Sequence, residues 1–96
     1  MDITKENKGN FTLLKINNQK LDSTLSPNLK AEFVLLSKQG NDKLLVDLSD
    51  VKYCDSSGLS ALLVGNRLCN DLGGKLVLSS LQEMVEKLIE IKNNEK

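Results

Sequence analysis

The stretch LLVDLSDVKYCDSSGLSALL, residues 44–63, contains the change of pattern that decides the fold. Residues 43–48 form a short aliphatic run between polar residues, which is typical of a strand buried on both faces. From Ser56 onward the apolar residues recur at helical spacing, which predicts a helix to Leu72 that stops at the glycine pair 73–74. A buried strand followed by a helix indicates a sheet with parallel strands.

Further strand patterns lie on both sides of this unit. Residues 2–4 are compatible with a short edge strand, residues 10–16 (NFTLLKI) predict a firmer strand, and residues 75–80 (KLVLSS) predict another. Strands that alternate with helices of ten or more residues require crossover connections and a sheet covered by helices. We therefore expect one α/β domain over residues 1–96, with a mixed or mostly parallel sheet of about four strands and helices packed on it.

Two more helices are predicted from capping residues and apolar spacing. The first begins at Ser26, a favourable N-cap that is followed by Pro27. Its apolar residues recur at helical spacing: Leu25, Leu29, Phe33 and Leu36. The last helix begins at Ser80, which forms a capping box with Glu83. It is followed by a polar tail at residues 92–96, which we expect to fray.

The composition argues against several functional classes. Thirteen basic residues balance thirteen acidic ones, whereas a nucleic-acid-binding protein normally has a basic excess. The chain has no histidine, so a His-based catalytic triad is excluded and a zinc site lacks its usual ligands. No paired carboxylates and no Gly-rich phosphate loop are present. We therefore expect a protein that is not an enzyme and that needs no metal or other cofactor.

The two cysteines and the N-terminus indicate a cytoplasmic protein. Cys54 and Cys69 each lie within an apolar pattern, so we expect reduced thiols in the core, with one disulfide between them as the alternative. Cys54 has no histidine partner that would make it a nucleophile. Residues 1–10 contain no signal-peptide pattern, and no apolar run is long enough for membrane insertion.

Helical geometry sorts residues 56–72 into two faces. The expected core face combines apolar and small residues: Gly58, Ala61, Leu62, Gly65, Leu68, Cys69 and Leu72. The opposite face carries Ser56, Ser60, Leu63 and Arg67, with Leu59 near its edge. Two leucines beside a hydroxyl group favour a partner-binding surface, and an ordinary solvated face is the alternative.

The adjacent serines at the start of this helix have two interpretations. Asp55 or Ser56 caps the helix by accepting a hydrogen bond from a free N–H group, which contributes about 1 kcal/mol. Alternatively, the serine hydroxyl is a phosphorylation site. A phosphate at a helix N-terminus meets unpaired N–H groups, and it adds nearly two negative charges beside Asp55. The spacing alone leaves both interpretations open.

The motifs together resemble a known family. They are the 44–63 stretch with its Asp55-Ser56-Ser57-Gly58-Leu59 motif, the later LGGKLVLSSL at residues 72–81, and Leu21-Asp22 before the first helix. From about residue 10 to residue 91 the chain resembles the STAS domain, in particular the small single-domain anti-anti-sigma factors (anti-sigma factor antagonists) of bacteria.

The resemblance implies a phosphorylation-controlled switch without catalytic activity. In that family the unphosphorylated protein binds an anti-sigma factor, which then releases its sigma factor. The anti-sigma factor is also an ATP-dependent serine kinase, which phosphorylates the serine after the aspartate and ends the interaction. A metal-dependent serine phosphatase reverses the modification.

Matched residue by residue, the resemblance makes Ser56 the phosphoacceptor, with Ser57 less favoured, and places Asp22 on the partner-facing edge. The full set of expected partner-binding residues comes from this match and from the helix face: Asp22, Asp55, Ser56, Ser57, Leu59, Ser60, Leu63 and Arg67.

Two features depart from the family pattern. Gln19-Lys20 stands where the family commonly has Gly-Glu, and the chain ends at Lys96, where the family usually continues with another strand and helix, so we expect a shortened C-terminus. The alternative function is that of a non-phosphorylated STAS adaptor subunit in a lipid transporter or a stress-signalling assembly. The oligomeric state is left open.

Overall fold

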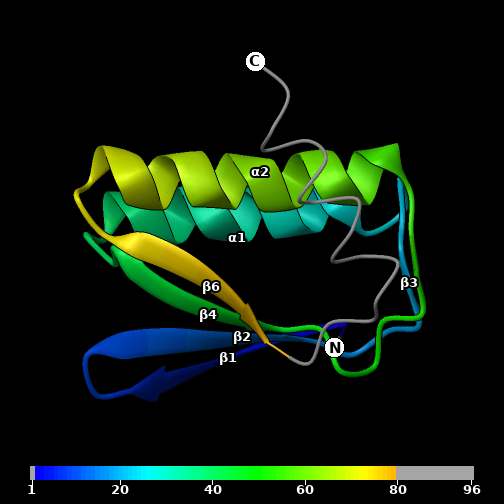
Figure 1. The fold of residues 1–96 in the computed structure, drawn as a ribbon, viewed down its shortest axis with the longest axis horizontal. Coiled ribbons are helices and arrows are strands. Elements are labelled where there is room, and N and C mark those ends of the chain that lie inside the picture. Colours follow the sequence, from blue (N-terminus) through cyan, green and yellow to red (C-terminus); the bar gives the residue numbers. More distant parts are fainter. Residues whose placement is uncertain (1, 80–96) are drawn as a thin grey trace.

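A computed structural model describes residues 2–79 and shows two helices stacked on a sheet (Figure 1). The elements in chain order are β1 (Ile3–Lys8), β2 (Phe11–Ile16), β3 (Lys20–Leu21), α1 (Ser26–Lys38), β4 (Lys43–Asp47), β5 (Tyr53–Cys54), α2 (Ser56–Asp71) and β6 (Lys75–Ser79). The predicted last helix, its capping box and the polar tail lie outside the described residues.

The main sheet has four strands in the order β1-β2-β4-β6, which confirms the predicted α/β fold with a mixed sheet. β1 is antiparallel to β2, whereas β2, β4 and β6 are parallel to one another. The edge strand predicted at residues 2–4 extends as far as Lys8, because β1 pairs with β2 along its whole length. The separate β3–β5 pair was not predicted, since strands of two residues show no periodicity.

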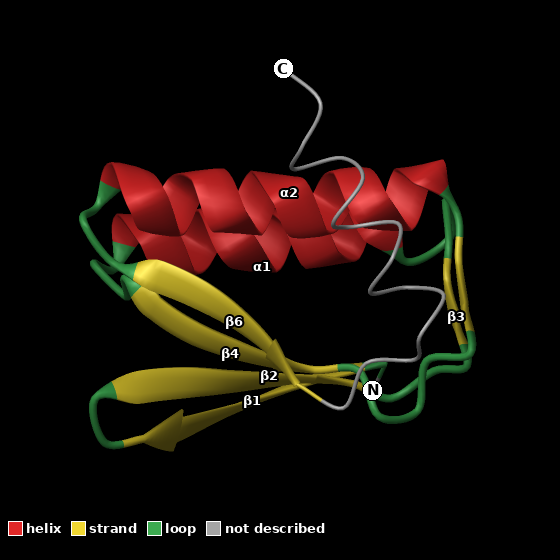
Figure 2. Ribbon diagram, viewed as in Figure 1, coloured by secondary structure: helices red, strands yellow, loops and turns green. Residues whose placement is uncertain are grey.

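Both helices cover the same face of the sheet (Figure 2). The expectation that residues 43–48 are buried on both faces is therefore wrong. Leu44 and Val46 are buried under the helices, whereas Leu45 and Asp47 face the other way and are only half-buried. Because β4 lies inside the sheet, its aliphatic run reflects a central position rather than two covered faces.

The start of α1 differs from the prediction that Ser26 is its N-cap. Leu25 occupies the cap position without a side-chain hydrogen bond, and Ser26 is buried in the first turn. The turn is closed instead by the backbone carbonyl of Asp22, which accepts hydrogen bonds from the N–H groups of Leu25 (3.1 Å) and Ser26 (2.8 Å). The apolar face predicted for this helix is confirmed: Leu25, Leu29, Phe33 and Leu36 are all buried.

The two helices meet closely at Gly65 of α2. A Cβ atom at this position would lie 2.7 Å from ring carbons of Phe33, which is itself 1% exposed. The predicted core face of α2 is confirmed for its buried members: Gly58, Ala61, Leu62, Gly65 and Cys69. Leu68 is half-buried, and Leu72, which was expected in the core, is 43% exposed because it lies just beyond the last turn.

Replacement of Gly65 by valine is expected to lower the free energy of unfolding by about 1–3 kcal/mol, because the added carbons overlap the buried ring of Phe33. Chemical denaturation measures the change. The matched control is Asn70→Val on the exposed side of the same helix, where we expect a change within about 0.5 kcal/mol. Equal stability of the two variants would contradict the close packing.

Both cysteines are free thiols buried in the core, as predicted, and they form no disulfide. Burial, with a smaller effect of the Asp55 carboxylate, raises the pKa of Cys54 from its ordinary value of 9.0 to about 11. Burial, followed by the charge of Asp42, also raises the pKa of Cys69. Both thiols are therefore protonated at neutral pH.

We expect Cys54 to react very slowly with iodoacetamide in the native protein. At pH 8 a thiol with a pKa near 11 is about 0.1% thiolate, compared with about 10% at a pKa of 9. Mass spectrometry after timed alkylation, with and without denaturant, measures the difference. Rapid native alkylation at pH 8 would show that the thiol is neither buried nor shifted.

Candidate functional site

The β3–β5 pair brings together two segments that are far apart in the sequence. The strands are parallel, with Lys20 opposite Tyr53 and Leu21 opposite Cys54. The backbone N–H of Asp55 donates to the carbonyl of Leu21 at 3.3 Å, which extends the ladder by one residue. Asp22 and Asp55 therefore follow adjacent strand ends, at the end of the molecule where α1 and α2 begin (Figure 1).

Gly58 allows the first turn of α2 to rest directly on β3. A Cβ atom at residue 58 would overlap the carbonyl oxygen of Leu21 and would lie 2.9 Å from the sulfur of Cys54. Any larger residue would push the helix away from the strand. The glycine of the Asp-Ser-Ser-Gly motif is thus required by packing, and it fixes the position of the serines relative to Asp22.

Asp55 is the N-cap of α2. Its backbone is extended, and its Oδ1 accepts a hydrogen bond from the N–H group of Gly58 at 3.0 Å. This decides between the two capping residues that the sequence allowed. Ser56 occupies the first helical position and is exposed, and within residues 2–79 its hydroxyl forms no hydrogen bond. The described part of the fold therefore places no hydrogen bond on this hydroxyl, and the neighbouring Ser57 is half-buried.

The predicted outward face of α2 is only partly exposed. Ser60 and Arg67 are exposed as predicted. Leu59, predicted at the edge of a contact surface, is 4% exposed and belongs to the core, so that prediction is wrong. Leu63 is half-buried and packs against the core. The reason is that α2 packs against α1 as well as against β6, so its buried arc is wider than a helix resting on a sheet alone requires.

One exposed residue beside the serines was missed by sequence analysis as a contact residue. Tyr53 is 49% exposed, and it lies opposite Lys20 on the outward side of the β3–β5 pair. Exposed aromatic residues are common at the energetic centres of interfaces. The signal was weak, because a two-residue strand shows only one alternation, with Tyr53 outside and Cys54 inside.

The charges around Ser56 are mixed. Asp22 accepts a hydrogen bond from the N–H group of Thr24 at 3.0 Å and remains partly exposed. Lys20 and Lys52 are both exposed on the same two segments. Within residues 2–79 no three acidic, cysteine or histidine side chains are grouped as metal ligands, and no helix combines the length and apolarity needed to cross a bilayer.

Comparison with known proteins identifies the family of this chain. The model of the family described as "Mlab, STAS domain" matches residues 8–95. The anti-sigma-B factor antagonist of Bacillus subtilis (strain 168) is 33% identical over 92 residues, which cover 95% of this chain and 84% of that protein.

Solved structures show the same fold. The anti-sigma factor antagonist SpoIIAA in its unphosphorylated form superimposes with a TM-score of 0.81 at 16% identity, over 93% of this chain and 82% of that chain. The phosphorylated form of SpoIIAA from Bacillus superimposes with a TM-score of 0.80 at 16% identity, over 94% of this chain and 82% of that chain. From the family match and the 33% identity, the chain belongs to the STAS domain family and is a relative of the anti-sigma factor antagonists.

Proposed function

We propose that this protein is a cytoplasmic anti-sigma factor antagonist without catalytic activity of its own. Its unphosphorylated form binds a kinase-type anti-sigma factor and releases the sigma factor. Phosphorylation of Ser56 by that kinase ends the binding, and a serine phosphatase restores it. The observation that supports this proposal most is the exposed hydroxyl of Ser56, which the fold does not need because Asp55 caps the helix.

The geometry favours Ser56 over Ser57 as the phosphoacceptor. Ser56 is exposed at the first helical position, whereas Ser57 is half-buried. A phosphate on Ser56 lies near the N–H groups and the positive end of the α2 dipole, and it leaves the hydrogen bond between Asp55 and Gly58 in place. The modified protein therefore stays folded, and the phosphate acts on the partner rather than on the domain.

The energy needed for such a switch is modest. A 100-fold loss of affinity corresponds to roughly 2.7 kcal/mol. A phosphate adds up to two negative charges beside Asp55 and near Asp22, and a like-charge contact or a desolvated phosphate in an interface costs several kcal/mol. One modification is sufficient to separate the two proteins.

Burial of Leu59 changes which residues are proposed to contact the partner. The apolar contacts with the partner are proposed to come from the exposed ring of Tyr53 and the exposed part of Leu63 instead of Leu59. Around them lie polar residues at the same end of the molecule, Asp22, Asp55, Ser56 and Ser60, whereas Arg67 lies about 16 Å farther along the exposed side of α2. Lys20, which replaces the acidic residue common in the family, favours an acidic group on the kinase at this point.

Incubation of the full chain with the anti-sigma factor serine kinase of its own organism and ATP is expected to place one phosphate on Ser56. Peptide mass spectrometry locates the modified residue. Ser56→Ala is expected to abolish the incorporation, whereas Ser57→Ala and the control Ser37→Ala, in the last turn of α1, retain it. Phosphate on Ser57, or no phosphate on this segment, would contradict the proposal.

Phosphorylated protein is expected to bind the same kinase at least 100-fold more weakly than unmodified protein, because the phosphate must be desolvated beside acidic groups. Isothermal titration calorimetry measures both affinities. Ser56→Ala is expected to bind like the unmodified protein, and Ser56→Asp to weaken binding only in part, since a carboxylate is smaller and carries less charge.

Equal affinities of the two forms would rule out the switch. Purification from cells provides a second control, because recovery of a membrane ATPase complex in place of a kinase and sigma factor would favour the adaptor role.

A further inference from the structure

The sheet has a second face that α1 and α2 do not cover. On β2 and β4 the residues that alternate with the buried ones point to this open face, as do those on β6 that alternate with the half-buried Leu76 and Leu78. The strand register aligns them in rows across the face. The middle row is apolar on these three strands, where it consists of Leu13, Leu45 and Val77, and it ends on the border strand β1 with Glu6, which lies opposite Leu13. Val77 is 44% exposed, and Phe11, at one end of β2, is 37% exposed.

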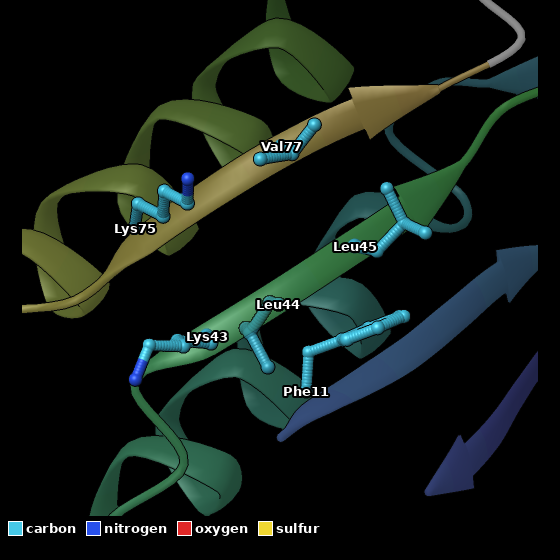
Figure 3. Close-up of a pocket in the computed structure, with 6 residues that line it drawn as sticks. All are labelled: Phe11, Lys43, Leu44, Leu45, Lys75 and Val77. Carbon is cyan, nitrogen blue, oxygen red and sulfur yellow. The ribbon is translucent and has the colours of Figure 1, made fainter. Parts of the chain in front are cut away.

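The apolar part of the open face is hollowed. A depression of about 200 Å³ lies over β4 and β6, lined by Phe11, Lys43, Leu44, Leu45, Lys75 and Val77 (Figure 3). Figure 3 shows the side chains of Leu45 and Val77 in the middle of the two strands, with the two lysines towards one end. The face therefore offers a shallow apolar surface with an uneven distribution of charge.

One end of the open face is basic and the other is acidic. Lys43 and Lys75 lie directly opposite each other on adjacent strands, and neither forms a salt bridge within residues 2–79. Like charges at opposite positions of a sheet are destabilising. At the other end the carboxylates of Asp47 and Asp50 share a single ammonium group, that of Lys15, at 3.8 Å each.

We propose that the open face docks against the open face of a second copy of this chain, with the strands of the two copies antiparallel. The reason is that the pattern of β4 is complementary to itself. A two-fold axis that crosses the strands at Leu45 places Lys43 opposite Asp47 of the second copy, and the reverse pair forms by symmetry. The middle row then meets its own counterpart: it is apolar on β2, β4 and β6, and at the exposed border Glu6 faces Glu6 of the second copy, each paired with Lys8 of its own chain.

The same axis also matches the neighbouring strands. On β2, Phe11 meets Lys15 of the second copy, which favours a cation–π contact, and on β6 Lys75 meets Ser79. A two-fold axis that runs parallel to the strands along β4 would instead place Lys43 of one copy opposite Lys43 of the other. Charge complementarity therefore selects the antiparallel arrangement.

The size of the face predicts a weak dimer. Four strands of about five residues cover roughly 300 Å² at ordinary strand spacing, whereas a standard interface buries about 800 Å² on each partner. Association is therefore expected only at high protein concentration. The face lies across the sheet from α2, so the dimer does not depend on the proposed function of Ser56, and Ser56→Ala is expected to leave it unchanged.

Charge reversal tests the arrangement by sedimentation equilibrium of the full chain between about 10 µM and 1 mM. Lys43→Asp places carboxylates opposite each other twice in the dimer and is expected to weaken association at least tenfold. Asp47→Lys is expected to do the same, and the double variant Lys43→Asp/Asp47→Lys to restore association. The matched control Lys38→Asp, at the exposed end of α1, is expected to have no effect.

Cross-linking tests the axis without relying on charge, because Asp47 also accepts a hydrogen bond from the N–H of Ser49 and its loss affects folding. Leu45→Cys lies on the axis and is expected to form a disulfide-linked dimer under mild oxidation. A mixture of Lys43→Cys and Asp47→Cys is expected to cross-link more than either variant alone. Cys54 and Cys69 are buried and give little background.

Several results would overturn the dimer. They are a monomer up to 1 mM, a dimer that is insensitive to Lys43→Asp, or efficient cross-linking of Lys43→Cys with itself. A Leu45→Cys thiol that resists alkylation equally at all concentrations would show that the face is covered within one chain, for which residues 80–96 are the available segment, and this result would also overturn the proposal.

Discussion

The contact between Gly58 and the carbonyl of Leu21 is the constraint on which the candidate site depends. Because no side chain separates the first turn of α2 from β3, the helix start and the segment before α1 lie next to each other. The β3–β5 hydrogen bonds hold the same two segments in register. A larger residue in place of the glycine would displace the first turn of α2 from β3, and Ser56 would move relative to Asp22.

The Asp-Ser-Ser-Gly motif divides structural and functional roles among neighbouring residues. Asp55 caps the helix, and Gly58 provides the close contact with β3. Ser56 has neither task, so a change in its charge removes no hydrogen bond among the residues from Asp2 to Ser79. This separation is what a reversible modification requires, because the domain must stay folded in both states while its surface changes.

The elements that follow a clear period could be predicted from the sequence, and the errors have physical causes. The strands at residues 11–16 and 75–79 and the extent of α2 were predicted because their patterns repeat over several residues. The β3–β5 pair is too short to show a period, and its hydrogen bonds place Tyr53 beside the site.

The remaining errors arose where tertiary packing decides the outcome. Leu59 is buried because α2 contacts α1 in addition to the sheet, which a helical wheel cannot show. Likewise, the backbone of Asp22 and not the hydroxyl of Ser26 organises the start of α1. Asp55 and Ser56 looked equivalent as caps, and only the backbone geometry distinguished them.

The polar character of β1 has a consequence for the behaviour of the protein in a crowded cell. This strand forms one border of the main sheet, and five of its six residues are exposed and polar or charged. Lysines and glutamate along a border strand discourage its unpaired backbone groups from recruiting a strand of another molecule. The polar strand β1 thereby disfavours strand addition and fibril growth at this edge of the sheet. A truncation that removed β1 would make the more apolar β2 the exposed edge strand.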